Sequence, residues 1–431
     1  IVAMMGPLTK FSQLIIDGNQ IPHLVRECFR IAEREKPGPT HLELPEDVAR
    51  EETDRSPFAI TDVDPASASL AAIKKAAALL TQAKAPLVAI ASGANRDSTH
   101  RALHQFIERT ELYFFTTQMG KGVVDERHPR CLGTTALSDH DYLHHAIDKA
   151  DVILNVGHDT SEKPPFFMVE NGKQIVIHLS FFEAEMDDVY FPQHEVIGCM
   201  TANLGMLTEA LGQRAETPEY FAEVKRKIDT HVFDKNDAQT FPNIPQRIVS
   251  DVRQAMPEDG ILSLDNGMYK IWFARNYPAY QPNTVLLDNA LATMGAGLPV
   301  AIAAKLVNPK RAVVAICGDG GFMMNSQELE TAVRLKLDLI VLVLRDNAYG
   351  MIRWKQDSME MKDFGLSFNN PDFVRYAESY GAHGHRVTKT GELCALMESS
   401  FKTGGVHLIE LPVDYSENET VLTDELKQIQ F

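Results

Sequence analysis

Two short acidic segments each follow an apolar run that has the composition of a buried strand. Gly318-Asp319-Gly320-Gly321 comes directly after residues 312–317, and Asp346 follows residues 339–344 after one intervening residue. Ligands in open α/β sheets bind at the carboxyl ends of strands, so neighbouring parallel strands would bring Asp319 and Asp346 together. Two carboxylates beside a glycine-rich turn suit a hard divalent cation next to a phosphate group, and we expect Mg²⁺ there.

Each segment also has a simpler interpretation when taken alone. A Gly-Asp-Gly-Gly sequence after a strand is commonly a tight turn, and Asp346-Asn347 is commonly a turn with side-chain-to-backbone hydrogen bonds. The combination at this spacing is more specific. We expect the first segment to enter a helix near Asn325 and Glu328, which have capping-box spacing, and the free N–H groups of that helix would favour an anion.

Apolar strands alternating with helices must position these residues. We expect C-terminal strands at 261–264, 284–286, 312–317, 339–344, 382–386 and 406–411, with helices at 296–306, 326–335, 371–380 and 391–401. We expect central strands at 87–90, 112–116, 152–156, 175–177 and 196–197, and a helix at 67–80. This alternation predicts an α/β fold of successive doubly wound parallel-sheet domains.

Proline and charge clusters divide the chain. They predict an N-terminal segment 1–55, a central domain 56–215, a linker 216–239 and a C-terminal domain 240–431. The first segment holds only a helix at 21–35 and a strand at 40–44, and the sequence opens without Met. We therefore expect it to be the end of a domain whose front is missing from this sequence.

Composition excludes several classes of protein. The 431 residues carry a net charge of −17, which argues against general nucleic-acid binding. The longest aliphatic runs are about six residues, whereas a membrane-spanning helix needs roughly 20. The five cysteines are an odd number without a CxxC pair, which favours reduced thiols in the cytoplasm.

The acidic segments together resemble the cofactor motif of thiamine diphosphate (ThDP) enzymes. Further resemblances to this family cover residues 7–10, 37–48, 120–122, 128–129 and 290–299. The sequence is most similar to acetolactate synthases, and its ending at 413–418 resembles the catabolic, FAD-independent type. The resemblance implies ThDP and Mg²⁺ as cofactors, and a reaction that decarboxylates pyruvate and condenses the two-carbon unit with a second pyruvate to give 2-acetolactate.

The resemblance also implies roles for individual residues. The metal ligands would be Asp319, Asp346 and the carbonyl of Ala348, with Asn347 as the alternative ligand if the register is shifted by one. Residues matched to cofactor binding are Gly267, Met268, Ala292, Met294, Gly318, Asp319, Gly320, Gly321, Asn347, Tyr349 and Gly350. Those matched to the reacting centre are Met294, Met351, Ile352 and Lys355.

Within this set, Gly320, Gly321 and the amides near Gly267 would hold the diphosphate. The carbonyl of Ala292 would accept a hydrogen bond from the aminopyrimidine. Met294 would lie beneath the cofactor and keep it bent, although a methionine at this place could also be ordinary core.

The sequence departs from the family in three ways. The glutamate that activates the cofactor in relatives would precede residue 1, and Glu27, Glu33, Glu35 and Glu43 do not match it. We interpret these four as solvated helix surface or strand ends, and expect a chain with no such glutamate to be nearly inactive.

The other two departures concern specificity. Lys355 stands where biosynthetic relatives have Trp, so it either meets an acceptor carboxylate or reaches solvent. The loop with His158 and Asp159 has no arginine matching the flavin-binding relatives, so FAD is unlikely on this resemblance, and we interpret that loop as a polar strand end.

The resemblance implies small 2-ketoacid substrates and a homodimer or homotetramer, with neither nucleic acid nor membrane as a partner. Two alternatives stay open. One is another ThDP-dependent 2-ketoacid decarboxylase or carboligase, and the other is a fragment that binds ThDP but is catalytically incomplete.

Overall fold

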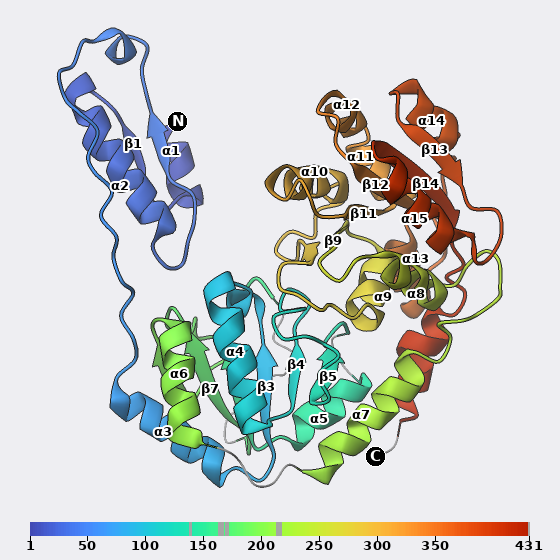
Figure 1. The fold of residues 1–431 in the computed structure, drawn as a ribbon, viewed down its shortest axis with the longest axis horizontal. Helices are drawn as coiled ribbons and strands as arrows, with labels where there is room; N and C mark the ends of the chain where they lie inside the picture. Colours follow the sequence, from blue (N-terminus) through green and yellow to red (C-terminus); the bar gives the residue numbers. More distant parts are fainter. Residues whose placement is uncertain (138–139, 163–167, 169–171, 213–217, 430–431) are drawn as a thin grey trace.

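The computed structural model describes residues 1–137, 140–162, 168, 172–212 and 218–429, which form three units (Figure 1). A small N-terminal unit lies at one end of the central domain in Figure 1. An extended segment, residues 51–69, joins it to the central domain. The C-terminal domain lies beside the central domain, and each of these two is built on its own six-stranded sheet.

The N-terminal unit contains two short strands and a long amphipathic helix. β1 (Ser12–Leu14) and β2 (His41–Glu43) pair in parallel, and α1 (Val2–Met5) and α2 (Ile21–Glu33) accompany them. The prediction of α2 and β2 is confirmed. β1 was not predicted, because its residues Ser-Gln-Leu do not form an apolar run.

The central sheet is entirely parallel, in the order β5-β4-β3-β6-β7-β8. Its strands are β3 (Pro86–Ile90), β4 (Phe114–Thr116), β5 (Cys131–Thr134), β6 (Val152–Val156), β7 (Ile175–Ser180) and β8 (His194–Ile197). Its helices are α3 (Leu70–Gln82), α4 (Asp97–Thr110), α5 (Tyr142–Lys149) and α6 (Met200–Leu211). Five of the strands match the predicted ones, whereas β5 was missed.

The C-terminal sheet is also parallel, in the order β10-β9-β11-β12-β14-β13. Its strands are β9 (Ile261–Leu264), β10 (Val285–Leu287), β11 (Val313–Gly318), β12 (Leu339–Arg345), β13 (His383–Arg386) and β14 (Val406–Pro412). Its helices are α8 (Pro245–Ala255), α9 (Met268–Asn276), α10 (Gly297–Val307), α11 (Asp319–Met324), α12 (Glu328–Arg334), α13 (Gly350–Ser358), α14 (Phe373–Ser379) and α15 (Glu392–Thr403). All six predicted strands are present, so the predicted fold class is confirmed.

The register of β11 and β12 positions the acidic segments. Gly318 lies opposite Leu344, so the residues that follow both strands emerge at one edge of the sheet. The predicted capping box is wrong. α11 begins at Asp319 itself, and Asn325 ends this helix and donates to the carbonyl oxygen of Gly295 (2.9 Å). The strand passes directly into the helix because Gly318 is extended and caps it.

Two further segments tie the large domains together. The predicted linker carries α7 (Glu219–Val232), whose apolar face, including Phe221 and Val224, packs into the central domain beside Tyr113. Residues after β14 return to the same core, where α16 (Glu425–Lys427) buries Leu426. The C-terminal segment therefore contacts both domains. The domain boundaries predicted from the sequence did not include this contact.

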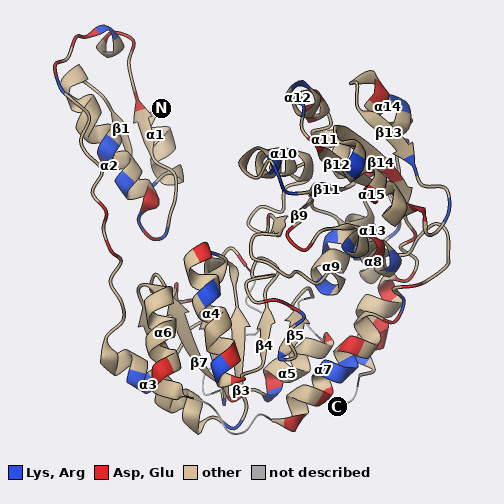
Figure 2. Ribbon diagram, in the orientation of Figure 1, with Lys and Arg blue, Asp and Glu red and all other residues tan. Residues whose placement is uncertain are grey.

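The charges are interspersed. In Figure 2, Lys and Arg alternate with Asp and Glu along surface helices such as α7, where Lys225 pairs with Asp229. No helix among the described residues is long and apolar enough to cross a membrane. All five cysteines are free.

His158 and Asp159 lie in the loop after β6, as predicted, and His158 is 4 % exposed with its ring against Tyr190 (centroids 4.1 Å apart), so its side chain is packed. One interpretation of a single residue is wrong. Glu35 pairs with Arg96 of the central domain rather than facing solvent, and Lys36 pairs with Asp159 (2.9 Å). These contacts attach the N-terminal unit to the carboxyl ends of the central strands.

Candidate active site

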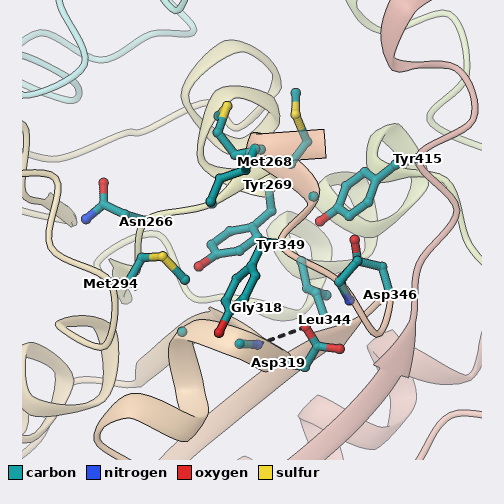
Figure 3. Close-up of a pocket in the computed structure, with 17 residues that line it drawn as sticks. Asn266, Met268, Tyr269, Met294, Gly318, Asp319, Leu344, Asp346, Tyr349 and Tyr415 are labelled. Carbon is teal, nitrogen blue, oxygen red and sulfur yellow. Dashed lines mark hydrogen bonds between the residues drawn. The ribbon is translucent and has the colours of Figure 1, made fainter. Parts of the chain in front are cut away.

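A small cavity of about 50 Å³ opens at the carboxyl edge of the C-terminal sheet. The segments after β9, β11 and β12 line it, together with Met294 from the loop before α10 and Tyr415 from the segment after β14 (Figure 3). The predicted residues that line this cavity are Gly267, Met268, Met294, Gly318, Asp319, Gly320, Gly321, Asp346, Ala348, Tyr349, Gly350, Met351 and Ile352. The structure thus brings most of the predicted set together.

Asp319 is 1 % exposed and is held from three sides. Its Oδ2 accepts hydrogen bonds from the backbone N–H of Asn347 (2.7 Å) and from Nδ2 of Asn370 (2.7 Å), and its Oδ1 accepts from the N–H of Gly320 (2.9 Å). Burial raises the pKa of Asp319, and these donors oppose the rise. The carboxylate is therefore fixed in direction before any ligand arrives.

Asp346 lies next to Asp319 at the end of β12. Burial, followed by the charge of Asp319, raises the pKa of Asp346 to about 7. Among the described residues, no Lys, Arg or His is within 4.0 Å of either carboxylate to form an ion pair. The charge of Arg353 offsets only part of the repulsion between Asp319 and Asp346, and a divalent cation would remove the rest.

Protein side chains alone would not complete such a metal site. No group of three or more His, Cys, Asp or Glu side chains in the described parts of the chain could hold an ion. A cation here would need two carboxylates plus oxygens from the backbone and from a ligand. That donor set fits Mg²⁺, which often keeps phosphate oxygens and water among its ligands.

The backbone of the cavity approaches its neighbours too closely for larger residues. A Cβ on Gly320 would lie 2.9 Å from the ring of Tyr349, and one on Gly321 would lie 2.7 Å from Oδ2 of Asp265. Gly267 caps the N-terminus of α9 and lines the cavity with Met268, and the unpaired N–H groups of a helix N-terminus favour an anion. This cradle fits a diphosphate group.

Met294 lies across the cavity from Asp319 and Asp346 (Figure 3). It is exposed to the cavity rather than buried in the core, as a residue that contacts a bound ring system must be. Ala292 has a positive φ of 50° and is exposed, and it does not line this cavity. The side chain of Asp288 holds the turn that contains Ala292, because its Oδ2 accepts a hydrogen bond from the N–H of Thr293 (3.0 Å).

Asn347 and Lys355 are also outside the cavity lining. Asn347 adopts a left-handed φ of 57°, and its Oδ1 accepts from Nδ2 of Asn370 (3.0 Å), so Asp346 rather than Asn347 faces the cavity. Lys355 is exposed on α13, with its Nζ 5.1 Å from the ring centre of Trp354. Of the two predicted positions for this side chain, beside an acceptor carboxylate or in solvent, the structure has the second.

Several residues that sequence reasoning missed complete the site. Asp265 is fully buried after β9 and accepts from the N–H of Gly295 (2.8 Å), and burial raises its pKa to about 6. The strand-end rule that found Asp319 could also have found Asp265. Asn370, Tyr269 and Tyr415 have no such sequence signal, because they come from a remote loop, the first turn of α9 and the segment after β14.

Two segments of the chain match models of known protein families. Residues 265–411 match the family model described as the thiamine pyrophosphate enzyme C-terminal TPP binding domain, and residues 73–207 match that of the central domain. Thiamine pyrophosphate is another name for ThDP. The chain is also 30% identical to acetolactate synthase of Bacillus subtilis (strain 168) over 98% of this chain and 75% of the relative.

The chain belongs to the acetolactate synthase family of ThDP enzymes. Other family members show similar identity. The catabolic acetolactate synthase of Raoultella terrigena is 29% identical over 98% of this chain and 76% of the relative, and the acetolactate synthase isozyme 2 large subunit of Escherichia coli (strain K12) is 26% identical over 95% and 74%. As a member of this family the protein is an enzyme of the carboligase type.

Proposed function

We propose that this enzyme binds ThDP with Mg²⁺ in the cavity and converts two molecules of pyruvate into 2-acetolactate and CO₂. One observation carries the proposal: Asp319 and Asp346 meet at the ends of adjacent parallel strands, opposite Met294, and no basic group of the described residues is close enough to form an ion pair with either. The names of the relatives in Bacillus subtilis and Raoultella terrigena support this product rather than another made with the same cofactor.

Different residues of the chain would bind the metal, the diphosphate and the aminopyrimidine. Asp319, Asp346 and the carbonyl of Ala348 would hold Mg²⁺. The backbone at Gly320 and Gly321, with the amides near Gly267 and Met268, would surround the diphosphate. The carbonyl of Ala292 would accept a hydrogen bond from the aminopyrimidine.

The remaining lining residues would control the environment of the reaction. When bound, ThDP supplies a carbon nucleophile and an electron sink for decarboxylation of a 2-ketoacid. Met294 would support the cofactor from below. Met351 and Ile352, at the start of α13, place apolar side chains on the cavity wall, which would keep water from the reacting carbonyl groups.

We also propose that the enzyme works in the cytoplasm as a homodimer or homotetramer. Large apolar side chains of the C-terminal domain are exposed: Leu291 and Phe364 are each 85 % exposed and Met359 is 69 % exposed. Covering such residues is a common reason for association. The five free cysteines fit a reducing compartment.

Titration calorimetry of ThDP with Mg²⁺ tests the proposal, followed by a pyruvate-to-acetolactate assay on the same samples. Asp319→Asn should abolish metal-dependent binding because it removes one charge from the metal site. Asp64→Asn removes the same charge from the exposed segment between domains and serves as the control, with unchanged binding expected.

Three other results would revise the proposal. Binding with a different product from 2-ketoacids would point to another decarboxylase or carboligase. Binding without turnover would identify a chain that holds ThDP but is catalytically incomplete. Equal binding by wild type and Asp319→Asn would reject the metal site.

A further inference from the structure

Lys270 is a partly buried lysine of α9 that none of the roles above uses. Its Nζ donates hydrogen bonds to Oδ1 of Asn266 (2.7 Å) and to the backbone carbonyl oxygen of Asp288 (2.7 Å). Burial lowers the pKa of Lys270 to about 8, and the charges of Asp288, Asp265 and Glu162 oppose that change. Taking an ammonium partly out of water costs free energy, which these two hydrogen bonds must offset.

The first hydrogen bond fixes the amide of Asn266, a side chain that lines the cavity (Figure 3). An ammonium can only donate, so the amide oxygen of Asn266 faces Lys270 and its NH₂ group is left to donate elsewhere. That NH₂ group donates to the carbonyl oxygen of Thr293 (2.9 Å). Lys270 therefore acts on the backbone at Thr293 through the amide of Asn266.

The second hydrogen bond holds the start of the segment that contains Thr293. Residues 288–296 form neither helix nor strand, so the regular backbone hydrogen bonds of those elements do not hold this turn. Lys270 contacts the first residue of the turn directly and contacts Thr293 through Asn266. The next residue, Met294, lines the cavity. The position of Met294 thus depends on a side chain of α9.

We propose that Lys270 is a positioning residue, whose two hydrogen bonds hold the turn at 288–296 in the shape that places Met294 against the cavity. This assignment rests on the proposed function, because it assumes that Met294 supports bound ThDP. The proposed metal ligands and the glycine cradle at Gly320 and Gly321 belong to other segments. Lys270 should therefore affect binding of ThDP much more than binding of a diphosphate without the organic rings.

Two variants interrupt this connection at different points, and a third is the control. Lys270→Met removes both hydrogen bonds to the turn, and Asn266→Ala removes only the one to Thr293. Lys305→Met is the matched control, because Lys305 is a buried lysine of the same domain that donates to the carbonyl oxygen of Arg311 (2.8 Å). Thermal melting shows that each variant is folded before the other measurements are made.

Hydrogen exchange followed by mass spectrometry measures the turn in the free protein, without any ligand. In Lys270→Met the amides of residues 288–296 should exchange on the order of tenfold faster, because loss of its hydrogen bonds lets the segment open more often. Asn266→Ala should also exchange faster there, by the same factor or less. Lys305→Met should exchange as wild type does.

Calorimetric titration then measures the consequence for ligand binding. Lys270→Met should bind ThDP with Mg²⁺ on the order of tenfold more weakly, and should bind inorganic diphosphate with Mg²⁺ within about twofold of wild type. Lys305→Met should bind both as wild type does.

Titration of ThDP at pH 7 and pH 9 adds a readout that a purely structural role would not change. Lys270 is mostly charged at the lower pH and mostly neutral at the higher one. Charge-assisted hydrogen bonds are stronger than neutral ones, so wild type should bind ThDP more weakly at pH 9. Lys270→Met should bind it equally at both. Asp288, Asp265 and Glu162 are present in both proteins, so the difference isolates Lys270.

Other outcomes separate this inference from the proposed function. If wild type binds ThDP, then unchanged exchange at 288–296 or unchanged ThDP affinity in Lys270→Met overturns the role of Lys270, and the proposed function stands. An equal loss for ThDP and inorganic diphosphate, or the same pH dependence in both proteins, would overturn it too. If wild type binds no ThDP, the proposed function fails. Faster exchange in Lys270→Met and Asn266→Ala alone would then still show that Lys270 holds the turn, and unchanged exchange would overturn both.

Discussion

At the scale of single residues, the site depends on how the acidic side chains are held. Asp319 follows β11 and would be an ordinary turn residue if solvent covered it. It becomes a candidate metal ligand because the N–H of Asn347 and the amide of Asn370 fix its Oδ2, each at 2.7 Å. Both donors come from segments far from Asp319 in sequence. The local sequence supplies the carboxylate, whereas segments distant in the sequence fix its orientation.

Asn370 should therefore affect metal binding without touching the metal. Asn370→Ala removes the donor to Asp319 and to Asn347, and we expect roughly 10–100-fold weaker Mg²⁺-dependent ThDP binding, as for other residues that orient metal ligands. The neighbouring exposed Asn369→Ala is the control and should bind as wild type does. Calorimetric titration measures both, and wild-type affinity in Asn370→Ala would show that Asp319 needs no orienting partner.

At the scale of secondary-structure elements, close backbone approaches decide how helices cover the sheet. β13 is the edge strand of the C-terminal sheet and passes directly under α14. A Cβ on Gly384 of β13 would lie 2.4 Å from the carbonyl oxygen of Val374 in α14. Only glycine permits this contact, so the helix lies flat on the strand and the buried Phe373 and Ala377 reach the core.

Gly384→Ala should destabilise the C-terminal domain by about 1–3 kcal/mol, because the helix must move away from the strand. The matched control is Gly205→Ala in α6, where an added Cβ meets nothing within 4 Å. That change should be neutral or stabilise by up to about 1 kcal/mol. Urea unfolding followed by circular dichroism measures both variants, and equal effects would contradict the packing argument.

At the scale of the whole molecule, a buried ion pair connects the cavity to the central domain. Arg275 of α9 contacts Asp141, which precedes α5, with Nε to Oδ2 at 3.0 Å and Nη2 to Oδ1 at 3.1 Å. Both side chains are at most 5 % exposed. Because α9 begins at the cavity, this pair fixes the position of Gly267 and Tyr269 relative to the central domain.

Arg275→Met should destabilise the protein by about 3–5 kcal/mol, since it leaves Asp141 buried without its partner. Adding Asp141→Asn should recover much of that loss, because the remaining buried charge is removed and the amide oxygen can still accept from Tyr142. The exposed pair of Arg127 and Glu258 provides the control: Glu258→Gln should cost less than about 1 kcal/mol. Differential scanning calorimetry distinguishes these effects, and a small loss in Arg275→Met would show that the domains need no such contact.

The alternating strands and helices, the fold class and the two aspartates at strand ends could be predicted from the sequence alone. These features are local, because a buried strand is an apolar run and the residue after it is known from the same few positions. Thus β9, β11, β12 and β14 were found almost to the residue. β1 and β5 were missed because their residues, Ser-Gln-Leu and Cys-Leu-Gly-Thr, do not form apolar runs.

Which residues contact each other in the site and between the domains depends on the tertiary structure. It placed Asn370, Tyr269 and Tyr415 beside Asp319, turned Asn347 and Lys355 away from the cavity, and joined Arg275 to Asp141. Such pairs are separated by tens to more than a hundred residues, so no spacing along the chain encodes them. Sheet order, side-chain burial and close glycine contacts set them, and these arise only when the whole chain has packed.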